Sequence, residues 1–355
     1  MLKKLEGWWR RQWIRALTGA MRSPSTPRPD WSARPHRVLF LRHDRIGDMI
    51  VSTGLIHAIA ESHPGLELDV LASPSNAPIV AGAPDVRRVI VFDRRRVSSY
   101  LPALRELRAQ KYDAVIDCMV TAPSVTTLLL MAASGAPYRI GIAGRGNDGA
   151  INIPVPAVGG ESHMTLELGA LAAAFGIDPR SRDWSPILTI PPAMLETAAA
   201  RWRSIGQGVG RRVLVNVSAG PVTRRWQTGK YVEVIAHIRR RIPDAQIFVT
   251  GAPNEQDRIA AVVEGSGATR APTGSLMEVF ALVATADFVF TPDTSVAHAA
   301  SALRRPVVAM YRQREPRRWG VDRDVGECVE HTGDMLEDLP VAPVLAAIDR
   351  VIARQ

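Results

Sequence analysis

Short apolar runs alternate with segments of helical spacing along the first half of the chain. The first run, residues 38–41, is followed by a polar stretch and then by apolar residues at helical spacing as far as residue 59, which predicts strand, loop and helix. The later runs predicted as strands are 66–71, 86–92, 114–118 and 138–142, and the segments predicted as helices are 74–83, 100–109, 124–133 and 164–175. Such alternation predicts a parallel sheet covered by helices.

The same alternation starts again in the second half. Its predicted strands are 213–217, 246–250, 287–291 and 306–311. Between the two series, residues 178–192 are rich in proline, so we expect a hinge there. The sequence therefore predicts an α/β protein with one domain at 37–186 and a second at 187–355. Ligands of open parallel sheets bind beyond the carboxyl ends of the strands, so the loops that follow the strands should hold the site.

Residues 1–36 have a different pattern. On a helical wheel the basic side chains occupy one face, and the other face carries Leu2, Leu5, Trp9, Trp13, Ala16, Leu17 and Ala20. This basic amphipathic pattern is typical of a helix that lies in a membrane interface, so residues 1–22 predict an anionic membrane surface as a partner. A helix docked on the protein's own body is the alternative. The proline-rich residues 23–35 predict an extended linker.

The charge of the chain is concentrated in this N-terminal segment. The chain has 355 residues, which favours two domains, and a net charge of +9. Residues 1–37 hold nine Lys or Arg against two acidic residues, so +7 of that charge lies there. The body is nearly neutral, which argues against nucleic acid as a partner.

The cysteine content and the apolar runs bear on localisation. Cys118 and Cys328 are the only cysteines, and both adjoin apolar, strand-like sequence, so we expect buried thiols in a reducing compartment. Charges interrupt the N-terminus where a signal peptide needs an apolar region, and the run at 128–133 is too short to span a bilayer. The sequence favours a cytoplasmic protein associated peripherally with the inner face of the cytoplasmic membrane.

The candidate chemistry of the first domain centres on Asp48, which falls where the first predicted helix of the body begins. A carboxylate there either favours the helix dipole or serves as a general base. Residues 144–149 match the dinucleotide pattern GxGxxG, but residues 151–156 contain two prolines and cannot form the helix that this pattern requires. We therefore reject a dinucleotide site.

Three loops of the second domain carry candidate ligand contacts. Ser218, Ala219 and Gly220 are small and precede Arg224, whose guanidinium suits phosphate. Glu255 follows another strand, where it can accept hydrogen bonds from a ribose. The sharpest motif follows a predicted strand and leads into a predicted helix, whose first backbone amides can bind an anion. It consists of Thr291, Pro292, Asp293, Thr294, Ser295, Val296, Ala297 and His298.

Plainer interpretations of these residues stay open. Asp293 as a helix N-cap and His298 as a packed core histidine are the alternatives to a role in binding. Asp322 and Asp324 match a metal-binding DxD pattern that arises often by chance, and we interpret them as a solvated loop. We expect neither a metal nor another cofactor.

Taken together, the motifs resemble glycosyltransferase family 9, the ADP-heptose:lipopolysaccharide heptosyltransferases. The resemblance rests on Arg-x-x-x-Ile-Gly-Asp at 42–48, Arg-Trp at 225–226 and Asp-Thr-Ser-x-x-His at 293–298, and it runs from about residue 38 to residue 320. It implies a GT-B fold, in which two Rossmann-like domains face a central cleft, the first for the acceptor and the second for the nucleotide sugar.

The resemblance also implies roles for individual residues. Asp48 matches the family's catalytic base, and Arg224 falls where the family has a diphosphate-binding Lys. The other residues implied at the donor site are Ser218, Ala219 and Gly220 at the phosphates, Glu255 at the nucleoside, and Asp293, Thr294, Ser295 and His298 in the donor motif. Residues 311–314, Tyr-Arg-Gln-Arg, replace the family's usual Gly-Pro-Thr turn, which leaves the donor sugar or the acceptor contact there open.

The function implied is inverting, metal-independent transfer of a sugar, heptose from ADP-heptose, onto a lipid-linked lipopolysaccharide core acceptor, with Asp48 as general base. Acceptor contacts are expected in residues 94–99 and 121–124. A non-catalytic nucleotide-binding scaffold and another GT-B enzyme, such as a sugar-nucleotide epimerase, are the alternatives.

Overall fold

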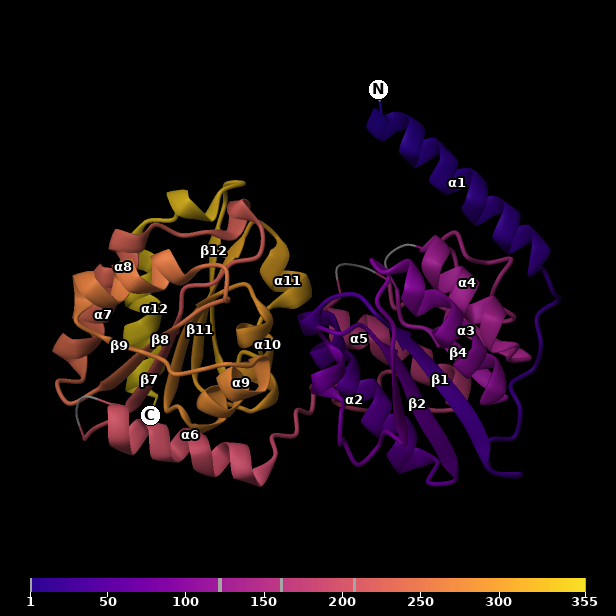
Figure 1. Cartoon of the computed structure of the whole chain (residues 1–355), viewed down its shortest axis with the longest axis horizontal. Helices are drawn as coiled ribbons and strands as arrows, with labels where there is room; N and C mark the ends of the chain where they lie inside the picture. The colour runs from indigo at the N-terminus through magenta and orange to yellow at the C-terminus, as the bar shows by residue number, and fades with distance from the viewer. Residues whose placement is uncertain (1, 121–122, 160–161, 207–208, 355) are drawn as a thin grey trace. The chain divides into compact units, whose positions relative to one another are not determined.

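The computed structural model describes residues 2–120, 123–159, 162–206 and 209–354, and side chains from residue 7 onward within the first helix. The chain forms two compact units, Met1–Ile187 and Leu188–Gln355, each with its own parallel sheet (Figure 1).

The first unit is a six-stranded sheet in the order β3-β2-β1-β4-β5-β6. Every strand pair is parallel, and the central strand β1 is buried on both faces, as its continuous apolar run requires. The strands are β1 His36–Arg42, β2 Leu66–Ala72, β3 Arg88–Val91, β4 Ala114–Asp117, β5 Tyr138–Ile142 and β6 Ile153–Val155. The helices are α1 Leu2–Ala20, α2 Ile46–Ser62, α3 Tyr100–Ala109, α4 Val125–Ser134 and α5 Met164–Gly169, with short 3-10 turns η1 Ala77–Ile79, η2 Val97–Ser99 and η3 Ala170–Phe175.

Two segments of the first unit bear directly on the sequence predictions. Residues 151–156 contain β6, an edge strand that tolerates Pro154, so the rejection of a dinucleotide motif is confirmed. The helix predicted at 74–83 is wrong, because only the turn η1 forms there. Asn76 bends the chain instead: its side chain accepts from the Ser73 amide at 2.7 Å and donates to the Arg42 carbonyl at 3.1 Å.

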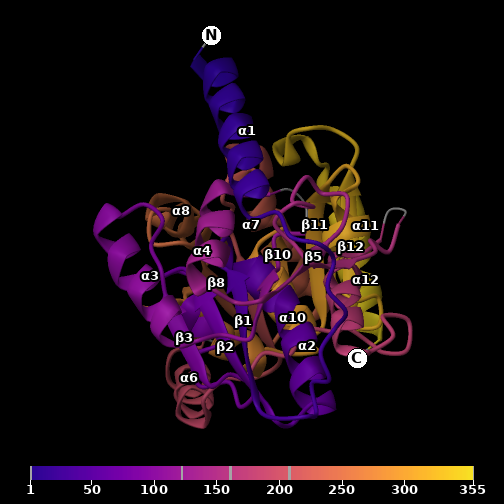
Figure 2. The ribbon, with the colours of Figure 1, turned by 90° about the vertical axis from the view of Figure 1, so that its right-hand side faces the viewer.

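The C-terminal part of helix α1 contacts α4, and its N-terminal end points away from the first unit (Figures 1 and 2). Ile14, Leu17 and Met21 are half-buried and pack on the core cluster that includes residues of α4. Trp9 and Trp13, on a neighbouring stripe, stay 54% and 58% exposed. Of the apolar face expected from the wheel, Leu17 packs on the body and Trp9 and Trp13 face solvent, while the side chains of Leu2 and Leu5 lie outside the described residues.

The proline-rich segment after α1 is fastened to the first unit. The Thr26 amide donates to the Asn152 carbonyl at 2.8 Å. Trp31 is buried, stacks on Phe175 and donates its indole N–H to the Ala174 carbonyl at 2.9 Å. The predicted linker has no helix or strand, but it is bound along the body rather than extended into solvent.

The second unit repeats the same topology, with the sheet order β12-β11-β10-β7-β8-β9. Trp226 is buried beside Tyr231 in its core and donates to the Leu339 carbonyl at 2.9 Å. The strands are β7 Arg212–Asn216, β8 Gln246–Thr250, β9 Thr269–Arg270, β10 Phe288–Pro292, β11 Val307–Arg312 and β12 Gly326–His331. The helices are α6 Pro192–Ile205, α7 Thr228–Arg241, α8 Gln256–Ser266, α9 Leu276–Thr285, α10 Ser295–Ala302, α11 Glu315–Trp319 and α12 Val341–Ala353, with turns η4 Val222–Arg224 and η5 Leu336–Asp338.

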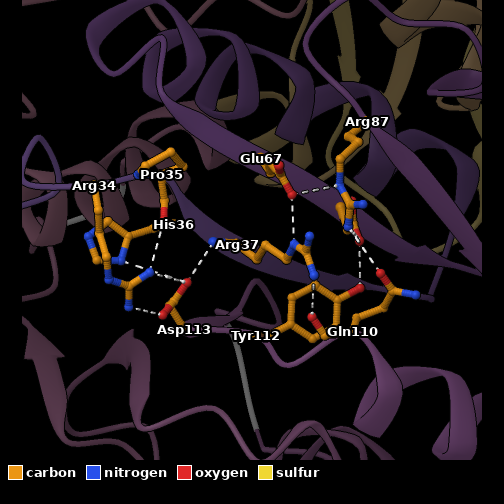
Figure 3. A network of polar contacts seen from close by, with 10 residues as sticks. Arg34, Pro35, His36, Arg37, Glu67, Arg87, Gln110, Tyr112 and Asp113 are labelled. Atoms are coloured by element: carbon orange, nitrogen blue, oxygen red, sulfur yellow. Dashed lines mark hydrogen bonds and ion pairs between the residues drawn. The ribbon is translucent and has the colours of Figure 1, made fainter.

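A network of ion pairs closes the amino edge of the first sheet (Figure 3). Asp113 accepts from Arg34 and from the Arg37 amide, while the Arg37 side chain reaches Glu67 at 2.7 Å. The network also includes Asp69, fully buried, which accepts from Arg87 at 2.5 Å and from the Tyr112 hydroxyl at 2.7 Å. These strand ends face away from the edge where ligands of parallel sheets bind, so we interpret the network and the polar pocket beside it as structural.

The cysteines and helices bear on the predicted environment of the chain. Cys118 is buried and Cys328 is half-buried, and neither forms a disulfide. Burial raises the pKa of the Cys118 thiol to about 12 and that of Cys328 to about 11, so both stay protonated at neutral pH. No helix in the described part of the chain has the length and apolar character that a membrane span needs.

Candidate active site

Asp48 lies in the first turn of α2, at the carboxyl edge of the first sheet. Its backbone carbonyl accepts from Arg42 Nε at 3.0 Å and from Ser52 Oγ at 2.7 Å, and its Oδ1 lies 3.5 Å from Arg42 Nη2. The Asp48 side chain is 14% exposed, and that of Arg42 is 3% exposed. The buried Arg42 guanidinium thus contacts the Asp48 carboxylate, which stays partly exposed to solvent.

Arg42 was noted in the sequence only as the first letter of a motif, yet it organises this edge. It ends β1 and donates across the sheet to the Cys118 carbonyl, which follows β4, at 2.5 Å. Burial opposes its charge, but the carboxylates of Asp44 and Asp48 outweigh that cost and raise the pKa of the guanidinium. The signal for this role was an arginine at the end of a buried apolar strand, which needs anionic or carbonyl partners.

Asp117, at the end of β4, is a second buried acid that the sequence analysis missed. It accepts from the Met119 amide at 2.9 Å and from Asn147 Nδ2 at 3.2 Å. Burial raises the pKa of Asp117 to about 6 despite these hydrogen bonds. A carboxylate that closes an apolar strand was the signal available in the sequence.

The structure describes the predicted acceptor loops in part. In residues 94–99, Ser99 Oγ donates to the Asp93 carbonyl at 2.6 Å, and Val97 is 87% exposed. In the second loop, residues 121 and 122 lie outside the described residues, and the Pro123 carbonyl accepts from Arg10 of α1 at 3.0 Å. The acceptor role of both loops stays a prediction.

In the second unit, Asn216 joins two of the predicted loops. It ends β7, and its Nδ2 donates to Thr291 Oγ1 at 2.9 Å and to Thr294 Oγ1 at 3.1 Å, beside β10. Its Oδ1 accepts from the Ser218 amide at 3.1 Å. β7 and β10 are the strands at which the strand order reverses, the usual place for a ligand in this kind of sheet. Sequence reasoning passed over Asn216 as the last residue of an apolar strand.

Glu255 is tied to the phosphate loop predicted from the sequence. Its Oε2 accepts from Ser218 Oγ at 2.6 Å and from the Ala219 amide at 3.3 Å. Its residue exposure is 5%, and Arg225 Nε lies 3.6 Å from Oε1. Gly220 next to them is exposed, with open space where a side chain would stand. Glu255 therefore shapes the loop, and its predicted contact with a nucleoside stays a prediction.

Arg224 and the motif at the end of β10 lie together. Arg224 Nη1 is 3.0 Å from Asp293 Oδ2, and Nη2 donates to Glu315 Oε1 at 2.9 Å. The N-cap of α10 is Thr294, whose Oγ1 accepts from the Val296 amide, so the interpretation of Asp293 as the N-cap is wrong. Ser295 opens the helix. Arg224 and the motif that follows β10 thus meet at one polar edge.

Two further predicted features lie near this edge or on the surface of the unit. His298 is 8% exposed, and its ring lies edge-on to Trp319 with centroids 6.0 Å apart, as expected of a packed histidine. Asp322 Oδ1 accepts from the Asp324 amide at 2.9 Å and Oδ2 pairs with exposed Arg304 at 3.3 Å, a turn at the surface. Among the described residues, no group of three His, Cys, Asp or Glu side chains is placed to hold a metal ion.

Comparison with known proteins gives consistent results. Residues 101–335 match the model of glycosyltransferase family 9 (heptosyltransferase). The lipopolysaccharide heptosyltransferase 3 of Escherichia coli is 21% identical over 338 residues, which cover 86% of this chain and 96% of that protein.

Solved structures share the fold. The glycosyl transferase family 9 protein of Veillonella parvula superposes with a TM-score of 0.79 at 16% identity, over 91% of this chain and 98% of that one. The E. coli ADP-heptose lipopolysaccharide heptosyltransferase II gives a TM-score of 0.72 at 20% identity, over 90% and 99% of the two chains. The predicted α/β fold of the GT-B type is confirmed. The chain is a glycosyltransferase and belongs to glycosyltransferase family 9, the heptosyltransferase family.

Proposed function

We propose that the chain transfers heptose from ADP-heptose to a saccharide acceptor of the lipopolysaccharide core, with Asp48 as the general base. The names of the relatives support the donor and the acceptor class: one is a lipopolysaccharide heptosyltransferase, and another is named for ADP-heptose. The observation that carries the assignment of the base is a solvent-accessible carboxylate fixed by a buried guanidinium at a ligand-binding sheet edge.

The proposed reaction is a single displacement. The acceptor hydroxyl oxygen bonds to the anomeric carbon, the bond from that carbon to the phosphate oxygen breaks, and ADP leaves with the electron pair. Asp48 takes the hydroxyl proton, and Arg224 stabilises the charge on the leaving diphosphate. One attack with one base inverts the anomeric centre. The proposal assigns no step to a metal ion.

The test replaces Asp48 by Asn, which keeps the shape of the side chain but cannot accept the proton. We expect turnover of ADP-heptose with a core acceptor to fall roughly 10²- to 10⁴-fold, with ADP affinity and melting temperature little changed. Asp85→Asn is the matched control, because Asp85 pairs at 2.9 Å with His57, which lies in α2 as Asp48 does. This substitution should leave turnover unchanged.

Three outcomes separate the proposal from its alternatives. An Asp48→Asn protein that melts early but transfers at the native rate would show that Asp48 only favours the helix dipole. Wild-type protein that binds ADP-heptose without turnover would indicate a scaffold. Conversion of free sugar nucleotide without an acceptor would indicate an epimerase.

We also propose that residues 1–22 hold the enzyme at the inner face of the cytoplasmic membrane, where a lipid-linked acceptor would be reached. Trp9 and Trp13 are more than half exposed on a helix whose docked seam is a different one, and Arg11 and Arg15 on the same helix are exposed too. Exposed tryptophan beside arginine suits the headgroup region of an anionic bilayer.

A further inference from the structure

Two arginines of the second unit share a single carboxylate oxygen. Glu315 Oε1 accepts from Arg224 Nη2 at 2.9 Å and from Arg312 Nη2 at 2.6 Å. Arg224 ends the turn η4, Arg312 ends β11, and Glu315 opens α11. Arg312 lies only three residues before Glu315, whereas Arg224 comes from 91 positions away, so two distant segments meet at one oxygen atom.

The place of this cluster is the ligand edge of the sheet. β11 pairs with β10, and Arg312 lies two positions beyond Met310, the partner of Pro292. Asp293, which follows β10, also contacts Arg224. Arg312 belongs to the segment 311–314, where the sequence left the donor sugar or the acceptor contact open.

The cluster holds two guanidinium groups and, with Asp293, two carboxylates, so it can attract an anion only when Glu315 moves away. The side chains of Arg224, Arg312 and Glu315 are 20%, 28% and 16% exposed. Burial raises the pKa of Glu315, but the two arginines lower it by more. The pKa therefore lies below its usual value, and Glu315 is ionised at neutral pH. The Nε atoms of Arg224 and Arg312 are buried and have no hydrogen-bond partner within the described residues. A ligand with several oxygens would therefore contact the partly exposed portions of the two side chains rather than these Nε atoms.

We propose that Arg224 and Arg312 form a two-arginine diphosphate site, which the Glu315 carboxylate fills in the ligand-free protein and leaves when a diphosphate binds. A phosphate oxygen between two guanidinium groups makes the same charge-assisted contacts that Glu315 Oε1 makes. The identification of this diphosphate as that of a sugar donor rests on the proposed function. Binding is then a competition between an internal carboxylate and the ligand.

This competition gives the two residues opposite effects on affinity. Removing Arg312 removes a ligand contact, so Arg312→Gln weakens diphosphate binding. Removing the charge of Glu315 removes the competitor, so Glu315→Gln strengthens it. Glu315→Asp keeps the charge on a shorter side chain, and its affinity falls between those of the wild type and Glu315→Gln.

The experiment is calorimetric titration of the full chain with ADP, adenosine and inorganic diphosphate, each variant being checked by a thermal melt. For Arg312→Gln we expect affinity for ADP and for diphosphate to fall roughly 10- to 100-fold, the usual range for a lost charge-assisted hydrogen bond. Adenosine affinity should not change. For Glu315→Gln we expect ADP and inorganic diphosphate each to bind at least about threefold more tightly than they bind the wild type.

Glu327 provides the matched control. It also joins two arginines, Arg350 and Arg354, each at 2.6 Å, and its side chain is 15% exposed. It lies near the start of β12 opposite Val308, toward the other end of the strands. Glu327→Gln and Arg350→Gln should therefore leave every affinity unchanged.

The inference is overturned if Arg312→Gln binds ADP and diphosphate as the wild type does. It is equally overturned if Glu315→Gln folds normally but binds them more weakly, because the carboxylate would then position the arginines and remain in place. Inorganic diphosphate binding that follows Arg312 and Glu315, in a protein that transfers no sugar from ADP-heptose, would refute the proposed function alone. A wild type that binds neither ADP nor diphosphate would refute both.

Discussion

Asp117 and Asp113 are acids of the first sheet with opposite electrostatic surroundings. Asp117 is buried at the carboxyl edge, where burial raises its pKa to about 6. Asp113 lies at the amino edge, where burial also raises the pKa but hydrogen bonds from Arg34 and from the Arg37 amide lower it below 3.8. The two residues therefore make contributions of different sign to the free energy of unfolding.

The sign for Asp117 follows from proton binding. Its pKa is 3.8 before folding and about 6 after, so between these values the folded state holds more protons, and the free energy of unfolding falls as pH rises. Asp117→Asn removes this loss. We expect the free energy of unfolding of the variant, relative to that of the wild type, to rise by about 2 kcal/mol from pH 4.5 to pH 7.5. Urea unfolding at both pH values measures this difference.

Asp113→Asn is the control for this measurement. The stability that the ionised Asp113 contributes is present above 3.8 and is lost only as pH falls below it, so the variant should be destabilised equally at pH 4.5 and 7.5. Arg42, Asp44 and Cys118 also surround Asp117. If Asp117→Asn lowers the free energy of unfolding by the same amount at both pH values, these neighbours offset the effect of burial on the Asp117 carboxylate.

Single residues could be predicted where a motif marks them, and not where the partner is distant in sequence. Asp48, Arg224 and Thr294 stand in motifs at strand ends, and the structure places all three at such edges. Asn216 gains its role from Thr291, 75 positions away. That contact depends on the strand order, which hydrophobic spacing does not encode.

At the scale of elements, α1 packs on the body through Ile14, Leu17 and Met21 and exposes Trp9 and Trp13 to solvent. Deleting residues 1–22 would also strip Ile14 and Leu17 from the core cluster, so it would confuse loss of anchoring with loss of packing. Substituting the exposed stripe alone, as Trp9→Ser with Trp13→Ser, leaves the docked seam in place.

We expect this double variant to lose binding to vesicles of anionic lipid by tenfold or more, because burial of a large apolar side chain contributes about 1.5–3 kcal/mol. Co-sedimentation with vesicles measures the effect, and transfer to a soluble acceptor should be unaffected. Ile205→Ser with Val209→Ser is the control, since these residues are 44% and 92% exposed on the second unit. Vesicle binding that survives in the tryptophan variant would refute the anchor.

The strands that the sequence predicted well are those built on an apolar run with few polar interruptions. The apolar runs at 38–41, 246–250 and 306–311 coincide with β1, β8 and β11 to within two residues. The strands β6, β9 and β12 were not predicted, because they are short or mixed in polarity and depend on pairing with a neighbour at or toward the edge of a sheet. The turn at 74–83 was misread because the hydrogen bonds of Asn76 override helical spacing.

At the scale of the whole molecule, each unit has a hydrophobic core of its own. In the second unit the cluster runs from Val213 to Val351 and includes Trp226 and Phe290. Residues of α12 close it, among them Val344, Ala347 and Ile348. Because the described residues of this cluster all lie within the second unit, that unit should be stable without the first.

We therefore expect residues 188–355, produced alone, to melt in a single cooperative transition, followed by circular dichroism in the near ultraviolet. A fragment of residues 188–340, which lacks α12, is the control and should show no such transition. A disordered 188–355 fragment would mean that the second unit depends on the first for its fold.

Both sheets fasten their ligand edge in the same way. The polar residue that ends the first strand, Arg42 in one and Asn216 in the other, reaches sideways to the neighbouring strand or the residue just after it. Each half thus braces its own loops with contacts internal to that half. For protein engineering, this means that the loops on one sheet can be diversified in a library while the loops of the other sheet keep their own bracing contacts.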